Sequence, residues 1–486
     1  MTAKEVRDKY TSTIGIECHV QLKTKTKLFA AVGNDAREAP PNTLVSHICF
    51  GLPGALPVLN KEAVRLASRA AFALGSEPAH FSKFDRKHYF YPDLPKGYQI
   101  SQYDQPIIAG GYVDVPLIDA TTKETRSFRV GIVRAHLEED AGKSTHPTGK
   151  DYSLVDLNRA GTPLLEIVSQ PDMHSPIEAK AYVRELYLRM KYADVSDANL
   201  YYGNMRFDVN VSVSSDPNKL GIRTETKNLN SFRSVEKTIE YEINRQIEVL
   251  EKGGEVIQET RGWDDAKQRT FAQRSKEEAH DYRYMPDPDI PPVVLTEAYI
   301  ADVKAAMPKL PAEYRQELAG LGIDIKTAED IVAVPETAQV VSRILAAGGA
   351  EHARRVAFWL MRPTSDEVET EEQITVSDEG LVKLSQLVAD NKLSSTAAKE
   401  VLTELRVRGG DPEQIAEAKN LLQVSDEGEI AKIVAQVLAE NEKAANDVKN
   451  GEMKAIGFLV GQVMKASKGK ANPGLAQALI RKQLGI

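Results

Sequence analysis

Apolar and polar residues alternate in several short stretches of the first 295 residues, which is the pattern of β-strands with one buried face. These stretches are Ile14–Leu22, Arg129–Leu137, Leu164–Ser169 and Arg206–Ser214. Two further stretches, Lys61–Leu74 and Phe232–Leu250, have the apolar spacing of helices. Because strands and helices do not follow a regular alternating order, the pattern predicts an α+β domain with an antiparallel sheet.

The second part of the chain has a different pattern. The Pro-rich residues 287–292 predict a stiff linker, and the sequence beyond it is rich in Ala, Glu, Lys and Leu at helical spacing. Ser394-Ser395 and Gly409-Gly410 are typical of the start and the end of a helix. Residues 430–438 carry one apolar stripe, which we interpret as core and not as a cofactor site. We therefore expect three domains, at 1–295, 296–405 and 406–486, of which the last two are helical.

The predicted strands share an unusual polar face. Opposite the apolar side chains stand Glu17, His19 and Gln21 in the first strand, Arg206, Asp208, Asn210 and Ser212 in the fourth, and Arg223, Glu225 and Lys227 in a further alternating segment. The simpler interpretation is a solvated face of an antiparallel sheet. However, such faces mix Lys, Thr and Glu freely, whereas Glu, His, Asp, Asn and Arg gather here.

Glu166 is a single acid within an aliphatic strand, where its burial is costly unless it is paired or bound to a metal. A glutamate and a histidine two residues apart on one strand face can hold the same ion. Oxygen-rich sites with one histidine suit Mg²⁺ or Mn²⁺. The polar face is therefore a candidate site for a metal and phosphate.

Residues 138–145 contain a Gly-Lys-Ser sequence like the end of a phosphate-binding loop. That motif requires a glycine at position 137, which is Leu137 here. The preceding Glu138, Glu139 and Asp140 are acidic where backbone amides would have to cradle phosphate. We interpret these three acids as metal ligands or as a charged turn.

Composition fits a globular protein, with 42% hydrophobic and 27% charged residues and no apolar run long enough to span a bilayer. The polar residues 1–12 lack the features of a secretory or transit signal, so we expect a cytoplasmic protein. Cys18 and Cys49 are the only cysteines in the sequence, which excludes a zinc site built from cysteines alone.

The net charge of −8 is not typical of a non-specific nucleic-acid binder. Residues 453–486, in contrast, contain six basic residues and no acidic one. The basic residues are Lys454, Lys465, Lys468, Lys470, Arg481 and Lys482. This basic tail is either an electrostatic footprint for nucleic acid or a solvated helical face, and charge alone does not decide between them.

Long blocks of the sequence resemble the B subunits of tRNA-dependent amidotransferases, the GatB family. The blocks are residues 14–22, 51–61, 83–102, 136–146, 156–166, 227–232 and 281–289. Residues 457–462 and 471–473 are similar to the YqeY-like domain that ends the family's sequences. The blocks occur in order over nearly the whole chain, so that chance similarity is negligible.

The resemblance implies one member of a heterotrimeric carbon–nitrogen ligase. The B subunit would use ATP and Mg²⁺ to phosphorylate the side-chain carboxylate of Glu-tRNA(Gln) or Asp-tRNA(Asn). An amidase-type A subunit would supply ammonia from glutamine, and a small C subunit would brace the pair. The family's first domain is a cradle related to glutamine synthetase and guanido kinases, which would bind ATP, metal and the aminoacyl end of tRNA. The helical domains would hold the tRNA.

By matched position, the metal ligands would be Glu17, His19, Glu139 and Glu166, with Asp208 near the metal. Strand alternation leaves the choice between Glu138 and Glu139 open, and the family's motif favours Glu139. Lys87 and Lys96 match lysines of the family's ammonia route. Arg206 is a candidate clamp for phosphate or carboxylate, although pairing with Asp208 explains it equally well. The tail residues expected at tRNA are Lys465, Lys468, Lys470, Arg481 and Lys482.

The chain departs from the family at one place. Many members carry a pair of cysteine motifs that form a structural zinc site, and the matching positions here are Ala30, Val32, Ser46 and Cys49. We therefore predict no structural zinc. Two other functions stay open: a non-catalytic scaffold that binds tRNA, which leaves the polar face unexplained, and a stand-alone ligase that uses free ammonia.

Overall fold

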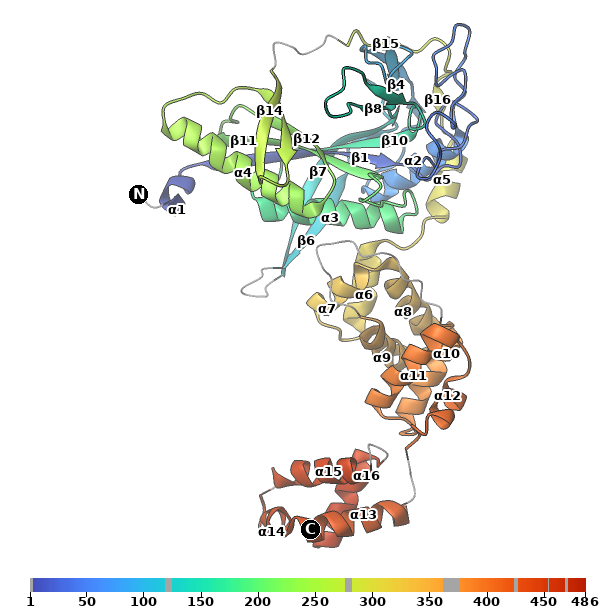
Figure 1. Cartoon of the computed structure of the whole chain (residues 1–486), viewed down its shortest axis with the longest axis vertical. Helices are drawn as coiled ribbons and strands as arrows, with labels where there is room; N and C mark the ends of the chain where they lie inside the picture. The colour runs from blue at the N-terminus through green and yellow to red at the C-terminus, as the bar shows by residue number, and fades with distance from the viewer. Residues whose placement is uncertain are drawn as a thin grey trace. The chain divides into compact units, whose positions relative to one another are not determined.

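The computed structural model describes residues 3–118, 125–275, 282–361, 376–423, 427–452, 454–467 and 471–486. The chain forms two compact units, Met1–Pro311 and Ala312–Ile486. Figure 1 shows a mixed sheet-and-helix unit followed by helices alone. This arrangement confirms the expected α+β class of the first part and the helical character of the second.

A central sheet organises the first unit. Among the described residues it has nine strands, in the order β14-β13-β12-β11-β1-β10-β7-β5, with β6 also paired to β7. The strands are β1 (Thr11–Gln21), β5 (Ile108–Ala109), β6 (Tyr112–Ile118), β7 (Thr125–Glu139), β10 (Pro163–Ser169), β11 (Met205–Ser214), β12 (Thr224–Leu229), β13 (Glu259–Asp264) and β14 (Arg269–Ser275). All recorded pairs are antiparallel except β12 with β13. The predicted antiparallel sheet is thus confirmed.

Helices cover the apolar face of this sheet (Figure 1). They are α2 (Lys61–Ala73), α3 (Pro176–Tyr192) and α4 (Phe232–Glu251), and a short helix α1 (Ala3–Arg7) precedes the first strand. The even-numbered residues from Ile14 to Leu22 are at most 1% exposed, and each such buried aliphatic side chain contributes about 1.5–3 kcal/mol. Ser231 caps α4 through its hydroxyl, which accepts the Ser234 amide at 3.0 Å.

Smaller sheets lie around the central one. β3 (Asp85–His88), β4 (Tyr98–Ser101) and β15 (Met285–Pro286) form one of them, and β4 packs against β7. The other pairs are β2 (Phe81–Ser82) with β16 (Val293–Val294), and β8 (Lys143–Thr145) with β9 (Leu154–Asp156). The Gly-Lys-Ser sequence therefore runs into a strand and not into the helix that a phosphate-binding loop needs, which confirms that it is not such a loop.

The remaining helices are α5 (Glu297–Ala305), α6 (Pro311–Gly320), α7 (Ile325–Val332), α8 (Pro335–Gly348), α9 (Ala350–Leu360), α10 (Asp378–Ala389), α11 (Ser395–Arg408) and α12 (Pro412–Ala418). Ser394 caps α11 and Gly409 follows its end, as predicted. Residue 405 lies inside α11, so that the expected domain division at 405 falls within a helix. α5 packs on α2 of the first unit.

The last helices are α13 (Glu427–Glu440), α14 (Glu442–Lys449), α15 (Ala455–Ala466) and α16 (Pro473–Leu484). Ile430, Val434 and Val437 of the predicted stripe are buried in their shared core, which confirms the core interpretation. Among the described residues no single helix is long and apolar enough to cross a membrane. α7 and α8 reach that length and composition only together, and they are bent by 111° at the break between them.

Candidate active site

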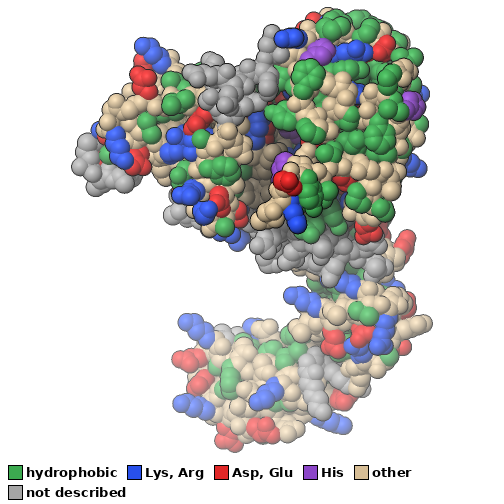
Figure 2. Space-filling view, turned by 45° about the horizontal axis from the view of Figure 1, so that its top comes forward, with side chains coloured by type: hydrophobic (Ala, Val, Ile, Leu, Met, Phe, Trp, Pro, Cys, Tyr) green, Lys and Arg blue, Asp and Glu red, His purple; other side chains and the backbone are tan. Residues whose placement is uncertain are grey.

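Neighbouring strands bring four residues into one row on the polar face of the sheet. Arg206 of β11 is the Cα partner of His19 in β1, His19 is the partner of Glu166 in β10, and Glu166 is the partner of His136 in β7. Side chains at opposed positions of antiparallel strands lie on the same face, about 4.5–5.5 Å apart at Cβ. Residues that are distant in sequence therefore become direct neighbours here. Figure 2 shows histidine, acidic and basic side chains together at the margin of a recess in the first unit.

Two clusters of ligand atoms occur on this face. His19, Glu138 and Glu166 form the first cluster, and Glu17, Asp208 and Glu225 form the second. Within each cluster, the three ligand atoms lie within 4.8 Å of one another. In the first cluster, His19 Nε2 is 3.6 Å from both Glu138 Oε1 and Glu166 Oε2.

The donor sets of both clusters fit a hard divalent cation. The first offers one imidazole nitrogen and two carboxylates, and the second offers three carboxylates. Mg²⁺ and Mn²⁺ prefer such oxygen-rich sets. Converging carboxylates are costly in a partly buried place unless a positive charge offsets them. The face is therefore built to receive positive charge.

The two histidines offset part of that negative charge. Burial lowers the pKa of His19, but its hydrogen bond to Glu166 and the charges of Glu166 and Glu138 outweigh this effect and raise the pKa to about 9. The pKa of His136 is likewise raised to about 9 by the same two carboxylates against its burial. Burial opposes ionisation of Glu166, yet His136 and His19 hold its pKa well below the usual value. Burial, and then the charge of Glu166, raises the pKa of Glu17.

His136 has no role in the sequence-based prediction. Its Nε2 lies 3.4 Å from Glu166 Oε2 and 3.6 Å from Glu138 Oε2. Its Nδ1 is buried and has no hydrogen-bond partner among the described residues. The sequence does contain an indication that His136 belongs to the site, because position 136 falls inside the predicted strand Arg129–Leu137. Continuing the alternation of that strand places His136 and Glu138 on one face.

The expected place of Glu139 beside His19 and Glu166 is corrected by the structure, which puts Glu138 there. β7 continues to Glu139, two residues beyond the predicted strand end. Because side chains alternate along a strand, Glu138 and Glu139 point to opposite faces of the sheet. The Glu139 side chain leaves the strand on the opposite side. There it forms an ion pair with Lys96 and accepts the Ile100 amide at 2.9 Å.

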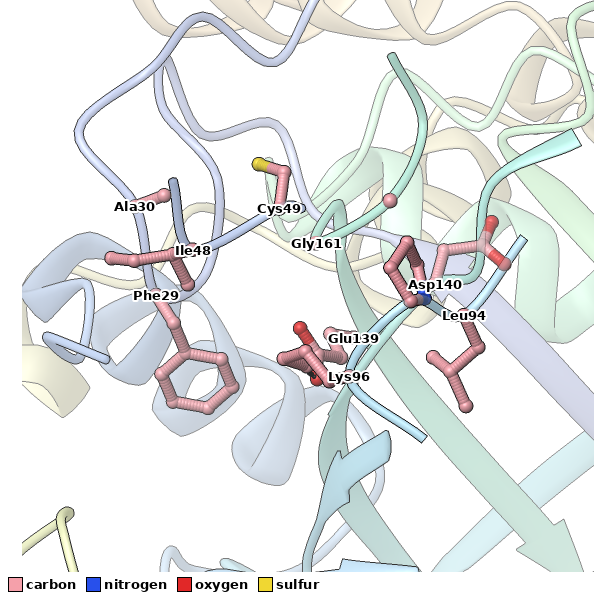
Figure 3. Close-up of a pocket in the computed structure, with 11 residues that line it drawn as sticks. Phe29, Ala30, Ile48, Cys49, Leu94, Lys96, Glu139, Asp140 and Gly161 are labelled. Atoms are coloured by element: carbon pink, nitrogen blue, oxygen red, sulfur yellow. Dashed lines mark hydrogen bonds and ion pairs between the residues drawn. The ribbon is translucent and has the colours of Figure 1, made fainter. Parts of the chain in front are cut away.

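Lys96 and Glu139 line a pocket (Figure 3). Its other lining residues are Phe29, Ala30, Ile48, Cys49, Leu94, Pro95, Asp140, Ala160 and Gly161. Lys87, in β3, lies with its Nζ 4.9 Å from the centre of the Tyr282 ring. Burial lowers the pKa of Lys87, but the charge of Glu138 in particular raises it above the usual value. Of the two predicted lysines, Lys96 therefore pairs with Glu139, and Lys87 is influenced by the charge of Glu138.

Arg206 and Asp208 do not pair with each other. Arg206 Nη2 donates to Asp140 Oδ2 at 2.8 Å, and Arg159 Nε is 3.3 Å from the same oxygen. Asp208 instead accepts from Lys227 Nζ at 2.9 Å. Arg206 therefore keeps its place in the row beside His19, and its interpretation as a partner of Asp208 is wrong.

The remaining predicted residues belong to the basic tail and to the positions that match the family's zinc motifs. Lys465 is in the last turn of α15, and Arg481 and Lys482 are in the last turn of α16, with all three exposed. Lys468 and Lys470 lie outside the described residues. At the positions that match the family's zinc motifs, Cys49 Sγ lies 3.4 Å from Lys27 Nζ and 3.6 Å from Ser46 Oγ.

Comparison with known proteins gives consistent matches over nearly the full length. Residues 12–301 match a model described as the GatB/GatE catalytic domain, and residues 339–484 match one described as the GatB domain. Similar proteins include the B subunits of the aspartyl/glutamyl-tRNA(Asn/Gln) amidotransferases of Caldanaerobacter subterraneus subsp. tengcongensis and Thermoanaerobacter pseudethanolicus. Each is 45% identical and covers 98% of this chain and 99% of the relative. The protein of the same name from Gloeothece citriformis is 42% identical, and the match covers 100% of this chain and 99% of the relative.

The placement of Glu138 and Glu139 on opposite sides of β7 predicts different effects on metal affinity. Glu138→Gln removes a carboxylate from the first cluster and should weaken Mn²⁺ binding by about tenfold or more, as calorimetric titration would measure. Glu139→Gln is the matched control, because it changes the adjacent residue in the same way, and it should leave Mn²⁺ affinity within about twofold. A larger loss in Glu139→Gln than in Glu138→Gln would contradict this assignment.

Proposed function

The chain belongs to the GatB family, and we propose that it activates, with ATP, the side-chain carboxylate of glutamate or aspartate attached to tRNA for conversion into the amide. The observation that carries this proposal is the pair of ligand clusters side by side on one sheet face. Relatives of nearly equal length are named as the B subunit of the aspartyl/glutamyl-tRNA(Asn/Gln) amidotransferase. Their name supports the same substrates, Glu-tRNA(Gln) and Asp-tRNA(Asn), for this chain.

The chemistry requires a site of this kind. A carboxylate does not react with ammonia, because it has no leaving group, and phosphorylation by ATP provides one. Phosphoryl transfer depends on positioning and on positive charge around the transferred group. Bound Mg²⁺ supplies that charge. His19, Glu138 and Glu166 would hold one cation, and Glu17, Asp208 and Glu225 a second. Arg206, in the row beside His19, would orient a phosphate or the substrate carboxylate.

Ammonia must reach the activated carboxyl group from elsewhere. We assign its supply to an amidase-type A subunit that hydrolyses glutamine, with a small C subunit completing the heterotrimer. Lys96 and Glu139 line the pocket of Figure 3. Glu139 is the residue that follows Glu138 in β7. Glu139, as a carboxylate, can accept a proton from an ammonium ion, and Lys96 orients it through their ion pair. Lys87, near Glu138, would line the end of the same route.

The proposal extends to the other parts of the chain. The first unit would act as a cradle of the glutamine synthetase and guanido-kinase type. The helical domains, including the YqeY-like tail with Lys465, Lys468, Lys470, Arg481 and Lys482, would hold the tRNA. We propose that the reaction takes place in the cytoplasm and that structural zinc has no part in it. A tRNA-binding scaffold is the weaker alternative, because it gives no reason for two convergent carboxylate clusters.

An amidation assay tests the proposal. The chain, assembled with its A and C partners, would receive ATP, Mg²⁺ and glutamine, and Glu-tRNA(Gln) and Asp-tRNA(Asn) would be supplied separately. We expect amide product on at least one of the two. Product that forms without the amidase partner, from glutamine alone, would contradict the assigned source of ammonia. No product on either tRNA from the assembled complex would support the scaffold alternative.

Variants of the first strand separate catalysis from binding. Glu17→Gln and His19→Ala each remove a ligand, and amide formation should fall by about a hundredfold or more, whereas tRNA binding should stay within about twofold. Glu240→Gln, at a partly exposed residue of α4, is the control and should leave both amide formation and tRNA binding unchanged. Unchanged amidation in Glu17→Gln and His19→Ala would refute the metal assignment.

The basic tail gives a separate test of tRNA binding. The triple variant Lys465→Ala, Arg481→Ala, Lys482→Ala should weaken tRNA binding and flatten its dependence on salt, because each lost phosphate contact removes about 0.7–0.9 from the slope of log K against log salt. Filter binding at several salt concentrations measures this slope. Lys252→Ala, at a lysine with a 71% exposed side chain just after α4 in the first unit, is the control and should leave the slope unchanged. An unchanged slope in the triple variant would show that these residues do not contact tRNA phosphates.

A further inference from the structure

A lysine side chain stands among the three carboxylates of the second cluster. Lys227 Nζ, from β12, is 2.9 Å from Asp208 Oδ2 and 2.7 Å from Glu225 Oε1. Glu17 completes the same cluster, with its ligand oxygen within 4.8 Å of the other two. The ammonium group therefore contacts two of the three carboxylates that would hold a cation.

The backbone directs Lys227 to this position by an irregularity in strand pairing. Phe207 of β11 pairs with Leu229, but Val209 pairs with Thr226, so that Lys227 and Asn228 together stand opposite Asp208. Asn228 adopts a left-handed conformation (φ 62°), which asparagine tolerates better than most residues. Its amide donates to Asp208 Oδ1 at 2.8 Å. The bulge thus supplies both oxygens of Asp208 with a donor.

We propose that Lys227 is the resident counter-cation of the second cluster, and that a divalent cation binds there only when the Lys227 ammonium withdraws. The inference rests on the proposed function, because it takes the second cluster as a cation position. In that reaction, Lys227 competes with the metal for the carboxylates of Asp208 and Glu225.

Charge repulsion forces this exchange. A divalent cation bound to carboxylates sits about 2.0–2.6 Å from their oxygens. An ammonium that kept its contacts to the same oxygens would then lie within a few ångströms of the metal, where repulsion between cations in a partly buried site is strong. Both cations therefore cannot use Asp208 and Glu225 together.

The lysine is the partner that has room to move. Its side chain is 36% exposed, whereas that of Asp208 is 5% exposed. Glu17 Oε1 accepts from Asn210 Nδ2 at 3.1 Å, and Glu225 Oε2 accepts from Thr260 Oγ1 at 3.3 Å. The carboxylates are held by these donors and by Asn228, so that Lys227 swings aside while the ligands stay in place. The displaced ammonium remains on a face that, in the proposed reaction, binds phosphate.

Titration with Mn²⁺, followed by electron paramagnetic resonance, tests the exchange on the complete heterotrimer. Lys227→Met removes the ammonium but keeps an unbranched side chain, and it should bind Mn²⁺ about tenfold tighter or more at one position. Lys227→Arg, which keeps the charge, should stay near wild type. Lys237→Met, at a partly exposed lysine of α4 paired with Glu240, is the matched control. The gain should disappear when Glu225→Gln is added to Lys227→Met. Unchanged or weaker binding in Lys227→Met would overturn the inference.

A second measurement needs no variant. Reductive methylation of the wild-type complex should label Lys227 several-fold faster with Mn²⁺ than without it, because the amine is released from its ion pairs, while labelling of Lys237 should not change. An equal or slower rate at Lys227 would overturn the inference.

Failure of the proposed function can be distinguished from failure of the inference. If the proposed function fails, the wild-type complex binds no Mn²⁺, and Glu138→Gln does not differ from wild type. Failure of the inference alone leaves wild-type Mn²⁺ binding intact and sensitive to Glu138→Gln.

Discussion

Carboxylates gathered on one face of a sheet repel one another, and the arrangement of the polar face depends on how this repulsion is offset. Converging acids in a partly buried place require counter-charges or hydrogen-bond donors. The imidazoles of His19 and His136 flank Glu166, and Lys227 with the Asn228 amide holds Asp208. Because these groups balance the charge, the carboxylates stay in position before any cation arrives. A cation that takes over this balance finds its ligands already oriented.

Alternation along single strands was enough to predict much of the fold. β10 and β11 contain the stretches expected from the sequence, and β1 includes all of the expected first strand except Leu22. Ser231 and Ser394 cap the predicted helices. These features are local, since a strand face or a helix cap depends on residues a few positions apart. The family resemblance, and not the alternation, supplied the expected reaction and its partners.

The partners of the polar residues could not be predicted in the same way, because they depend on register between strands that are far apart in sequence. Arg206 stands beside His19 but contacts Asp140, which lies just beyond the end of β7. Asp208 receives Lys227 only because of a bulge between β11 and β12. Sequence spacing suggested a contact between Arg206 and Asp208, and spacing contains no information about a bulge or about the partner that a third strand provides.

The end of β7 shows how a short error at a strand boundary changes the interpretation of a site. The strand predicted from the sequence ends at Leu137, and the acids from Glu138 to Asp140 are interpreted there as metal ligands or as a charged turn. The strand in fact continues to Glu139, and its pleat sends adjacent acids to opposite sides. Glu138 joins His19 and Glu166, whereas Glu139 meets Lys96 at the pocket. In the proposed reaction this separation has a purpose: the acid that helps to hold the cation and the acid that meets ammonia are one residue apart, and the backbone between them keeps the two charges from competing for the same partner.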